Sequence, residues 1–239
     1  MGKRLEINYR GRIGNLICYK RDGKYLLRLR PEKVNQTDAT RASAQIFGKA
    51  SRICGSMRKS FAPIIPDVKA RKLMLSLNKA IYTWLLKTTA SGNQPFHQVT
   101  TLNHISFNSE VEFSNKIKCR FETNWQTPGE LKLYIPAIRP SEELKMPPDT
   151  KSALLELMLF SCSLNAVPVV QIDKRTIFLD GSLDLIPSQE VLFNAGEEPG
   201  SIKIIAGALK YNNPDYDWNA VQPALKWKPA GIIEAVYIP

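Results

Sequence analysis

The spacing of apolar residues changes near residue 100, and this change limits the chain to a fold with separate helical and β-sheet parts. Over 46–61 and 70–85 apolar residues recur every three or four positions, which is the spacing of helices that bury one face. After Val99 they alternate with polar residues, as in strands that bury one face. Helical segments followed by many short strands are typical of an α+β fold.

The distribution of charge changes at the same place. Residues 1–100 hold 20 Lys and Arg against 5 Asp and Glu, a net charge of +15, whereas residues 101–239 hold 13 against 17, a net charge of −4. Proline has the opposite distribution, with 4 of its 16 residues in the first hundred. We therefore expect a basic hairpin and helical region over 1–90, a linker over 91–100 and a β-sandwich domain over 101–239.

Residues 14–30 predict a β-hairpin with its turn at Asp22-Gly23. Both positions of a two-residue hairpin turn need positive φ, which Asp and Gly tolerate. This turn places Arg21 opposite Lys24 and determines every pair beyond it, and cross-strand partners share a face. One face is predicted to need a core, and it carries Leu16, Cys18, Tyr25, Leu27 and Leu29. The other is a cationic ribbon with Tyr19, Arg21, Lys24, Arg28 and Arg30, and with Ile17 and Leu26 among them.

Two antiparallel helices are predicted to follow the hairpin. The first begins at Thr37 or Asp38, which are good capping residues, and ends before Pro63. The second covers about 67–88 and has one apolar stripe. The exposed side of the first helix carries basic residues at helical spacing, among them Arg41, Lys49 and Arg52.

The part after residue 100 contains many short strand-like segments separated by turn residues. They are 105–107, 111–113, 117–121, 131–135, 153–164, 167–172, 175–179, 190–194, 201–211 and 231–238. This pattern predicts an antiparallel sandwich of the immunoglobulin-like type. Segment 153–164 is apolar enough to form a helix, so its type stays open between strand and helix.

The sequence contains no common catalytic motif. It has two histidines, and it lacks G-x-S-x-G, a phosphate-binding loop, a dinucleotide glycine fingerprint and H-E-x-x-H. We therefore expect no enzyme activity, no cofactor and no metal site. Asp215, Asp217 and Asn219 begin like a calcium loop, but Ala220 and Lys226 stand where that loop requires Gly and Glu.

The basic first part predicts docking on an anionic macromolecule, either an acidic protein or a nucleic acid, because Lys and Arg bind phosphates and carboxylates with little geometric demand. The predicted polyanion-binding residues are Tyr19, Arg21, Lys24, Arg28, Arg30, Arg41, Lys49 and Arg52. The alternative is that these cations only form the solvent-exposed side of the hairpin and the helices and bind no partner.

Two further functions stay open. The hairpin could pair with a neighbouring subunit by strand addition, which would make the chain a self-associating structural subunit of a phage-like or other large assembly. Tyr216 and Trp218 could stack on sugar rings, which would make a carbohydrate-binding module, or they could be buried rings that hold a long loop.

Cysteine usage and hydropathy predict a cytoplasmic, reducing setting. Cys18, Cys54, Cys119 and Cys162 lie far apart, and none belongs to a C-x-x-C pair. The first residues contain no apolar leader, and the longest apolar run is much shorter than the ~20 residues of a membrane span. We expect no association with membranes.

The first quarter of the chain also carries a family resemblance. The matching residues are Gly11-Arg12-Ile13-Gly14-Asn15-Leu16, Tyr19, Gly23-Lys24, Arg28, Pro31, Val34-Asn35 and Thr37, followed by an Ala- and Gln-rich helix. With these residues the chain resembles a family of uncharacterised bacterial proteins, a domain of unknown function, in which such a basic start precedes a β-sandwich tail. Asn35-Gln36 stands where the family motif typically has Asn-Pro. The resemblance implies the two-part architecture and no activity.

Overall fold

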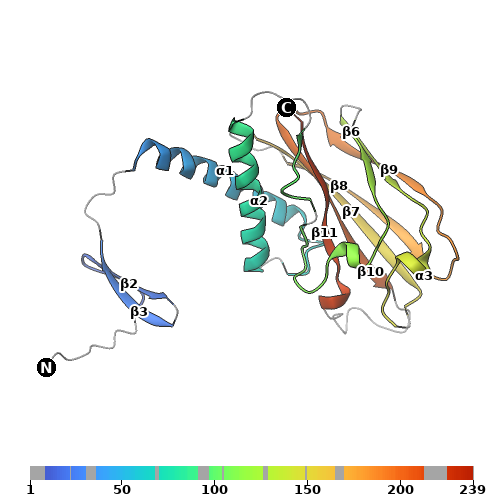
Figure 1. The fold of residues 1–239 in the computed structure, drawn as a ribbon, viewed down its shortest axis with the longest axis horizontal. Coiled ribbons are helices and arrows are strands. Elements are labelled where there is room, and N and C mark those ends of the chain that lie inside the picture. Colours follow the sequence, from blue (N-terminus) through green and yellow to red (C-terminus); the bar gives the residue numbers. More distant parts are fainter. Residues whose placement is uncertain are drawn as a thin grey trace. The chain divides into compact units, whose positions relative to one another are not determined.

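The computed structural model describes residues 9–21, 23–30, 36–67, 70–90, 97–103, 105–125, 129–148, 150–164, 170–212 and 225–238. The chain divides into two compact units, Met1–Ser43 and Ala44–Pro239. Figure 1 shows the elements of both units in chain order.

The first unit contains a three-stranded antiparallel sheet in the order β1-β2-β3. β1 covers Gly11–Ile13, β2 covers Leu16–Arg21 and β3 covers Lys24–Leu29. β2 and β3 pair from Arg21 opposite Lys24 outward, as the predicted turn requires. The predicted hairpin is therefore confirmed, and β1 adds a third strand that was not predicted.

Two long helices follow, α1 over Asp38–Ser60 and α2 over Arg71–Ala90. The Thr37 hydroxyl oxygen caps α1 by accepting a hydrogen bond from the Thr40 backbone N–H at 3.2 Å. Both predicted helices are confirmed, although α2 begins later than expected. α1 buries Ala50, Ile53, Cys54, Met57 and Ser60. α2 buries Leu73, Leu77, Ala80, Ile81, Trp84 and Leu85.

A five-stranded antiparallel sheet forms the centre of the second unit, in the order β4-β11-β10-β7-β8. Its strands are β4 (His97–Gln98), β7 (Ser152–Ser163), β8 (Val170–Asp180), β10 (Ser201–Asn212) and β11 (Ala230–Ile238). The open question over 153–164 is answered, because this segment is the strand β7. Residues 170–172 and 175–179 of the two predicted strands belong to one strand, β8, and residues 167–169 lie outside the described residues.

A second antiparallel sheet has three strands in the order β5-β6-β9. They are β5 (Glu122–Asn124), β6 (Gly129–Ile135) and β9 (Gln189–Gly196). The described residues also form short helical turns. η1 (Phe113–Asn115) and α3 (Pro140–Glu143) lie in segments that connect the two sheets, and η2 (Leu225–Trp227) precedes β11.

The strands predicted over 105–107, 111–113 and 117–121 are wrong. Apart from the helical turn η1, this stretch is irregular, and its strand-like pairing consists of isolated bridges such as Ser106 with Gly231. Its apolar residues are still buried, because they pack against the sheets without joining a ladder. The apolar residues buried there are Phe107, Phe113 and Ile117.

Two apolar cores lie on opposite faces of the five-stranded sheet. Met57 of α1 and Ile81 of α2 share the first core with Phe160 of β7. Leu133 of β6 shares the second core with Leu157 of β7. Figure 1 shows α2 on one side of the large sheet and β6 and β9 on the other. β7 is therefore buried on both faces, which explains its nearly continuous apolar sequence.

The predicted α+β class is confirmed, with an N-terminal hairpin, two long helices and antiparallel sheets. The compact units and the predicted segments divide the chain at different places, because α1 and α2 share a core with the large sheet. Residues 91–96 of the predicted linker lie outside the described residues. No helix in the described part of the chain is both long and apolar enough to cross a membrane.

Candidate functional site

Turn chemistry holds the three strands of the first unit in one register. Gly14 and Gly23 have φ values of 55° and 79°, which glycine adopts without strain. Asp22 of the predicted turn lies outside the described residues. At the open end of the hairpin, the Arg30 N–H donates a hydrogen bond to the Asn15 carbonyl at 2.7 Å. The side chains of β1–β3 therefore point to defined faces.

Cross-strand pairing gathers the basic residues on one face of this sheet. Arg12 of β1, Ile17 of β2 and Arg28 of β3 lie in one row across the three strands. Residues two positions along each strand share the same face. The complete set, termed the cationic face, is Arg12, Ile17, Tyr19, Arg21, Lys24, Leu26 and Arg28.

The cationic face has an apolar and aromatic centre surrounded by charge. Ile17 and Tyr19 are half-buried at this centre and Leu26 is exposed, whereas the four cations at the corners are all exposed. The Arg28 guanidinium lies over the Tyr19 ring, 5.8 Å from its centroid. Such a cation–π contact holds the arginine beside the ring while leaving its N–H donors available.

Acidic residues do little to neutralise this face. The sequence over 9–30 holds seven Lys and Arg and one carboxylate, Asp22. In the described part of the chain, Arg12, Lys24 and Arg28 form no ion pair. Within the described residues, this face of the sheet therefore carries a concentrated positive charge.

The opposite face is apolar, and we term it the apolar face. It carries Ile13, Leu16, Cys18, Tyr25, Leu27 and Leu29, together with Lys20. We predicted that a core covers this face, but no described residue covers it fully. Leu29 remains 74% exposed and Ile13 52% exposed. Cys18, in the central strand, is buried.

The predicted helical cations lie on α1. Arg41 forms an exposed ion pair with Asp38 at 3.5 Å and belongs to the same compact unit as β1–β3. Lys49 and Arg52 belong to the other unit, where Lys49 is half-buried and Arg52 exposed. The structure thus brings together the four predicted residues inside β2 and β3, and Arg30 follows β3 directly as an exposed residue.

Tyr216 and Trp218, the predicted sugar-stacking residues, lie outside the described residues. The two rings that flank them in sequence pack against the protein itself. Tyr211 and Trp227 meet edge to face at 5.9 Å, and the Lys116 ammonium lies 3.5 Å from the Trp227 ring centroid. Burial and nearby positive charges lower the pKa of Lys116. Tyr211 and Trp227 therefore hold their segments to the body of the protein.

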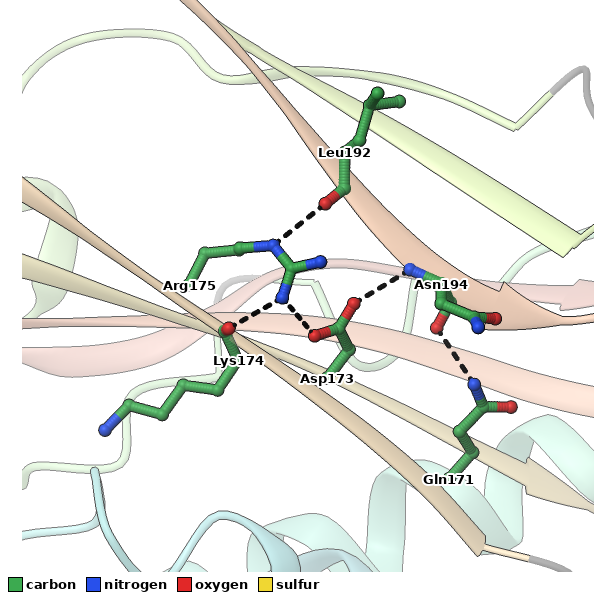
Figure 2. A network of polar contacts seen from close by, with 6 residues as sticks. All are labelled: Gln171, Asp173, Lys174, Arg175, Leu192 and Asn194. Atoms are coloured by element: carbon green, nitrogen blue, oxygen red, sulfur yellow. Dashed lines mark hydrogen bonds and ion pairs between the residues drawn. The ribbon is translucent and has the colours of Figure 1, made fainter.

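A polar network that was not predicted joins β8 to the edge of β9, as Figure 2 shows. The Arg175 Nε donates to the Leu192 carbonyl at 3.1 Å. The Asp173 carboxylate accepts the Asn194 N–H at 2.8 Å, and the Gln171 amide donates to the Asn194 carbonyl at 3.3 Å. Arg175 is also paired with Asp173. These side chains occupy the edge of β9 that does not pair with β6.

The sequence does contain a signal for this network. Gln171, Asp173 and Arg175 alternate with period two, which indicates one strand with a polar face. The predicted strands end at residue 172 and resume at 175, which leaves Asp173 and Lys174 outside them. Asp173 and Arg175 point instead toward the neighbouring sheet, where they bind backbone groups of β9, whereas Lys174 pairs with Glu156 on β7.

Charged side chains are also buried inside the large sheet. Glu156 on β7 is paired with Lys174 at 2.9 Å and with Lys210 at 2.8 Å. Burial acts to raise the pKa of Glu156, but the hydrogen bonds from both lysines outweigh it and hold this pKa below its usual value. Lys203 is 1% exposed and donates to the Gly196 carbonyl. Burial lowers the pKa of Lys203.

A hollow of about 500 Å³ lies between the start of α2 and the segment 106–115. Two of its polar side chains, Ser106 and Asn108, hold loops in place. The Ser106 hydroxyl donates to the Asn108 carbonyl at 2.6 Å, and the Asn108 amide donates to the Leu225 and Lys228 carbonyls at 2.6 and 2.8 Å. Among the described residues, no group of three or more His, Cys, Asp or Glu side chains could hold a metal ion.

Comparisons with known proteins show no family for this chain. No family model matches it. No curated protein matches it either. One solved structure that aligns with it is described as "CC2D1B coordinates ESRCT-III activity during the mitotic reformation of the nuclear envelope". That protein is 11% identical over 86% of this chain and 91% of its own, with a TM-score of 0.19, so the likeness carries no argument about fold or function.

Proposed function

We propose that this chain is a non-enzymatic binding or assembly protein that docks on an anionic macromolecule, an acidic protein or a nucleic acid. The observation that carries the proposal is the cationic face, where four exposed cations surround an apolar centre on one side of a registered sheet. A registered sheet holds these charges together, so they act on one partner at the same time.

The helices add to the same charge. Residues 39–90 hold ten Lys and Arg against one carboxylate, Asp67. Arg41, Lys49 and Arg52 are the helical residues proposed to strengthen attraction to the partner. Long-range attraction of this kind raises the association rate and weakens as salt screens it.

Reversing one charge on the cationic face tests the proposal. Fluorescein-labelled heparin and poly-L-glutamate serve as polyanion probes, and anisotropy measures binding from 50 to 400 mM salt. The wild type is expected to bind at low salt and to lose affinity steeply as salt rises. Arg28→Glu is expected to weaken binding about tenfold or more and to flatten the salt dependence, because it replaces an attractive contact by a repulsive one.

Lys20→Glu is the matched control, since it makes the same charge change on the apolar face. It is expected to weaken binding by no more than about threefold, through net charge alone. Equal losses in the two variants, or no binding of either probe at low salt, would contradict docking through the cationic face.

A second candidate is a structural subunit of a larger assembly, which self-associates through the sheet β1–β3. The exposed apolar face supports it, because an apolar surface carrying Leu27 and Leu29 is typical of a face that packs against another subunit. Light scattering after size exclusion measures the oligomer. A wild-type oligomer that dissociates in Leu29→Lys is the expected result, and a monomer at high concentration rules out this candidate.

We also propose that the two sheets of the second unit form an immunoglobulin-like sandwich, supported by the core they share. We further propose a cytoplasmic, reducing setting, which the four free cysteines support.

The residues that carry the resemblance to the bacterial family include Gly14 and Gly23, which shape the turns of β1–β3. We propose that members of that family share this sheet and its cationic face.

A further inference from the structure

We propose that the partner of the cationic face is a single-stranded nucleic acid, with a base stacked on Tyr19 and phosphates held by the surrounding cations. This inference rests on the proposed function and adds the chemical class of the partner. It depends on the centre of the face, which a purely electrostatic partner would not need.

The centre of the face offers stacking and apolar contact. Tyr19 lies between Ile17 on its own strand and Leu26 on β3, so an aromatic ring with apolar neighbours is available at the middle of the surface. Single-stranded nucleic acids expose the flat faces of their bases, and aromatic side chains bind them by stacking. A duplex keeps its bases stacked inside, and an acidic peptide needs only the cations.

The cations are placed around this centre at distances that suit a backbone passing beside it. Strands lie ~4.8 Å apart and residues rise ~3.4 Å along each strand. Arg12 and Arg28 lie in one row, two strands apart. Lys24 lies on β3, four residues before Arg28. The corners are therefore roughly 10 Å apart across the sheet and roughly 14 Å apart along it, which leaves room for a base between phosphate contacts.

Arg28 links the two kinds of contact. Its guanidinium lies 5.8 Å from the Tyr19 ring centroid, in a cation–π arrangement. Arginine in this position can donate to a phosphate while it stays beside the ring on which the base stacks.

The chain contains its own comparison for Tyr19. Tyr25 lies on the apolar face of the same sheet, with the Lys20 ammonium 5.3 Å from its ring centroid. Both tyrosines lie in the β2–β3 pair, and each has one cation near its ring. Only Tyr19 lies on the face that carries four cations. Removing each ring separates stacking on the cationic face from any general effect on the sheet.

The experiment measures binding of the full chain to fluorescein-labelled dT20, to a 20-base-pair duplex and to poly-L-glutamate, at 50 and 200 mM salt. Tyr19→Leu is expected to weaken dT20 binding by roughly 5- to 100-fold, because each stacked base contributes on that scale. Tyr19→Phe keeps the ring and is expected to bind dT20 as the wild type does. Tyr25→Leu is expected to stay within about twofold, and poly-L-glutamate binding is expected to be the same in all four proteins, since no charge changes.

Failure of this inference and failure of the proposed function give different results. If no polyanion binds at 50 mM salt, the proposed function itself fails. If polyanions bind but Tyr19→Leu leaves dT20 affinity unchanged, or if the duplex or poly-L-glutamate binds more tightly than dT20, the single-strand inference is overturned and the proposed function stands. Circular dichroism checks the sheet in each variant, and a loss in Tyr19→Leu that Tyr19→Phe does not restore counts against stacking.

Discussion

Glu156 shows how a single charged residue is accommodated in a strand whose neighbours are almost all apolar. Its side chain is 8% exposed, and it is paired with Lys174 and Lys210 from the two adjacent strands. The lysine side chains are about half exposed, so water shares part of their charge. Glu156 therefore joins three strands by ion pairs at the boundary between core and solvent.

Glu156→Gln is expected to lower the free energy of unfolding at pH 7 by about 1–2 kcal/mol, because two lysines lose their shared carboxylate. The pKa of Glu156 lies below its usual value of 4.5, so its contribution is present above pH 4.5 and is lost as pH falls through the lower folded value. The difference between wild type and variant should therefore shrink in acid. Urea unfolding at pH 7, 5 and 3.5 measures this difference.

The control for this prediction is Glu190→Gln. Glu190 pairs with Lys132 at 3.2 Å, but both side chains of this pair are about half exposed, whereas Glu156 is 8% exposed. An exposed pair contributes about 0–1 kcal/mol, so this variant should change stability less than Glu156→Gln. Equal effects of the two variants would mean that burial of Glu156 does not strengthen its ion pairs.

At the scale of elements, β9 ends its sheet with an edge that is occupied by side chains. A free edge strand presents backbone N–H and C=O groups that can pair with another chain. Here Gln171, Asp173 and Arg175 of β8 bond to those groups (Figure 2). The side chains of β8 thus replace a neighbouring strand and shield β9 from pairing.

Asp173→Ala is expected to free this edge of β9. The Asn194 backbone N–H loses its acceptor, and Arg175 loses its ion-pair partner. Hydrogen exchange at this backbone N–H should therefore accelerate by about tenfold or more. The exposed edge should also allow self-association that increases with protein concentration, as seen by light scattering.

Thr176→Ala serves as the control for the edge, because Thr176 lies on the other face of β8, opposite Glu156. It should leave both Asn194 exchange and the oligomeric state unchanged. If Asp173→Ala behaves like this control, the network does not protect the edge of β9.

At the scale of the whole chain, the large sheet needs layers on both faces. The helices α1 and α2 cover one face with Met57, Leu77 and Ile81, and the sheet β5-β6-β9 covers the other. Removing the helices would expose buried apolar residues such as Phe160 to water, and removing the sheet β5-β6-β9 would expose Leu157. The helices are therefore part of the same cooperative structure as the sheets.

Two fragments test this arrangement. Residues 44–239 are expected to melt cooperatively within a few degrees of the full chain, since this unit contains both cores. Residues 101–239 match the predicted β-sandwich segment but lack α1 and α2, so they are expected to show no cooperative transition. Thermal circular dichroism measures both. A fragment 101–239 as stable as the full chain would show that the helices are dispensable for the sheets.

Features that depend on nearby residues could be predicted from the sequence. The register of β2 and β3 follows from the turn at Gly23, and the start of α1 follows from the cap at Thr37. The gathering of Arg28 and Tyr19 on one face is a consequence of that register. Turns, caps and strand alternation act over a few residues, so the sequence alone determines them.

Features that depend on what covers an element were decided only by the tertiary structure. β7 is buried on both faces, which removes the alternation that distinguishes a strand from a helix. The stretch 105–121 alternates like strands, yet its residues are buried without strand pairing. Gln171, Asp173 and Arg175 gain their role from β9, whose bonded residues are 17 to 23 positions away in the sequence. Burial and hydrogen-bond partners come from distant segments, so only the folded chain specifies them.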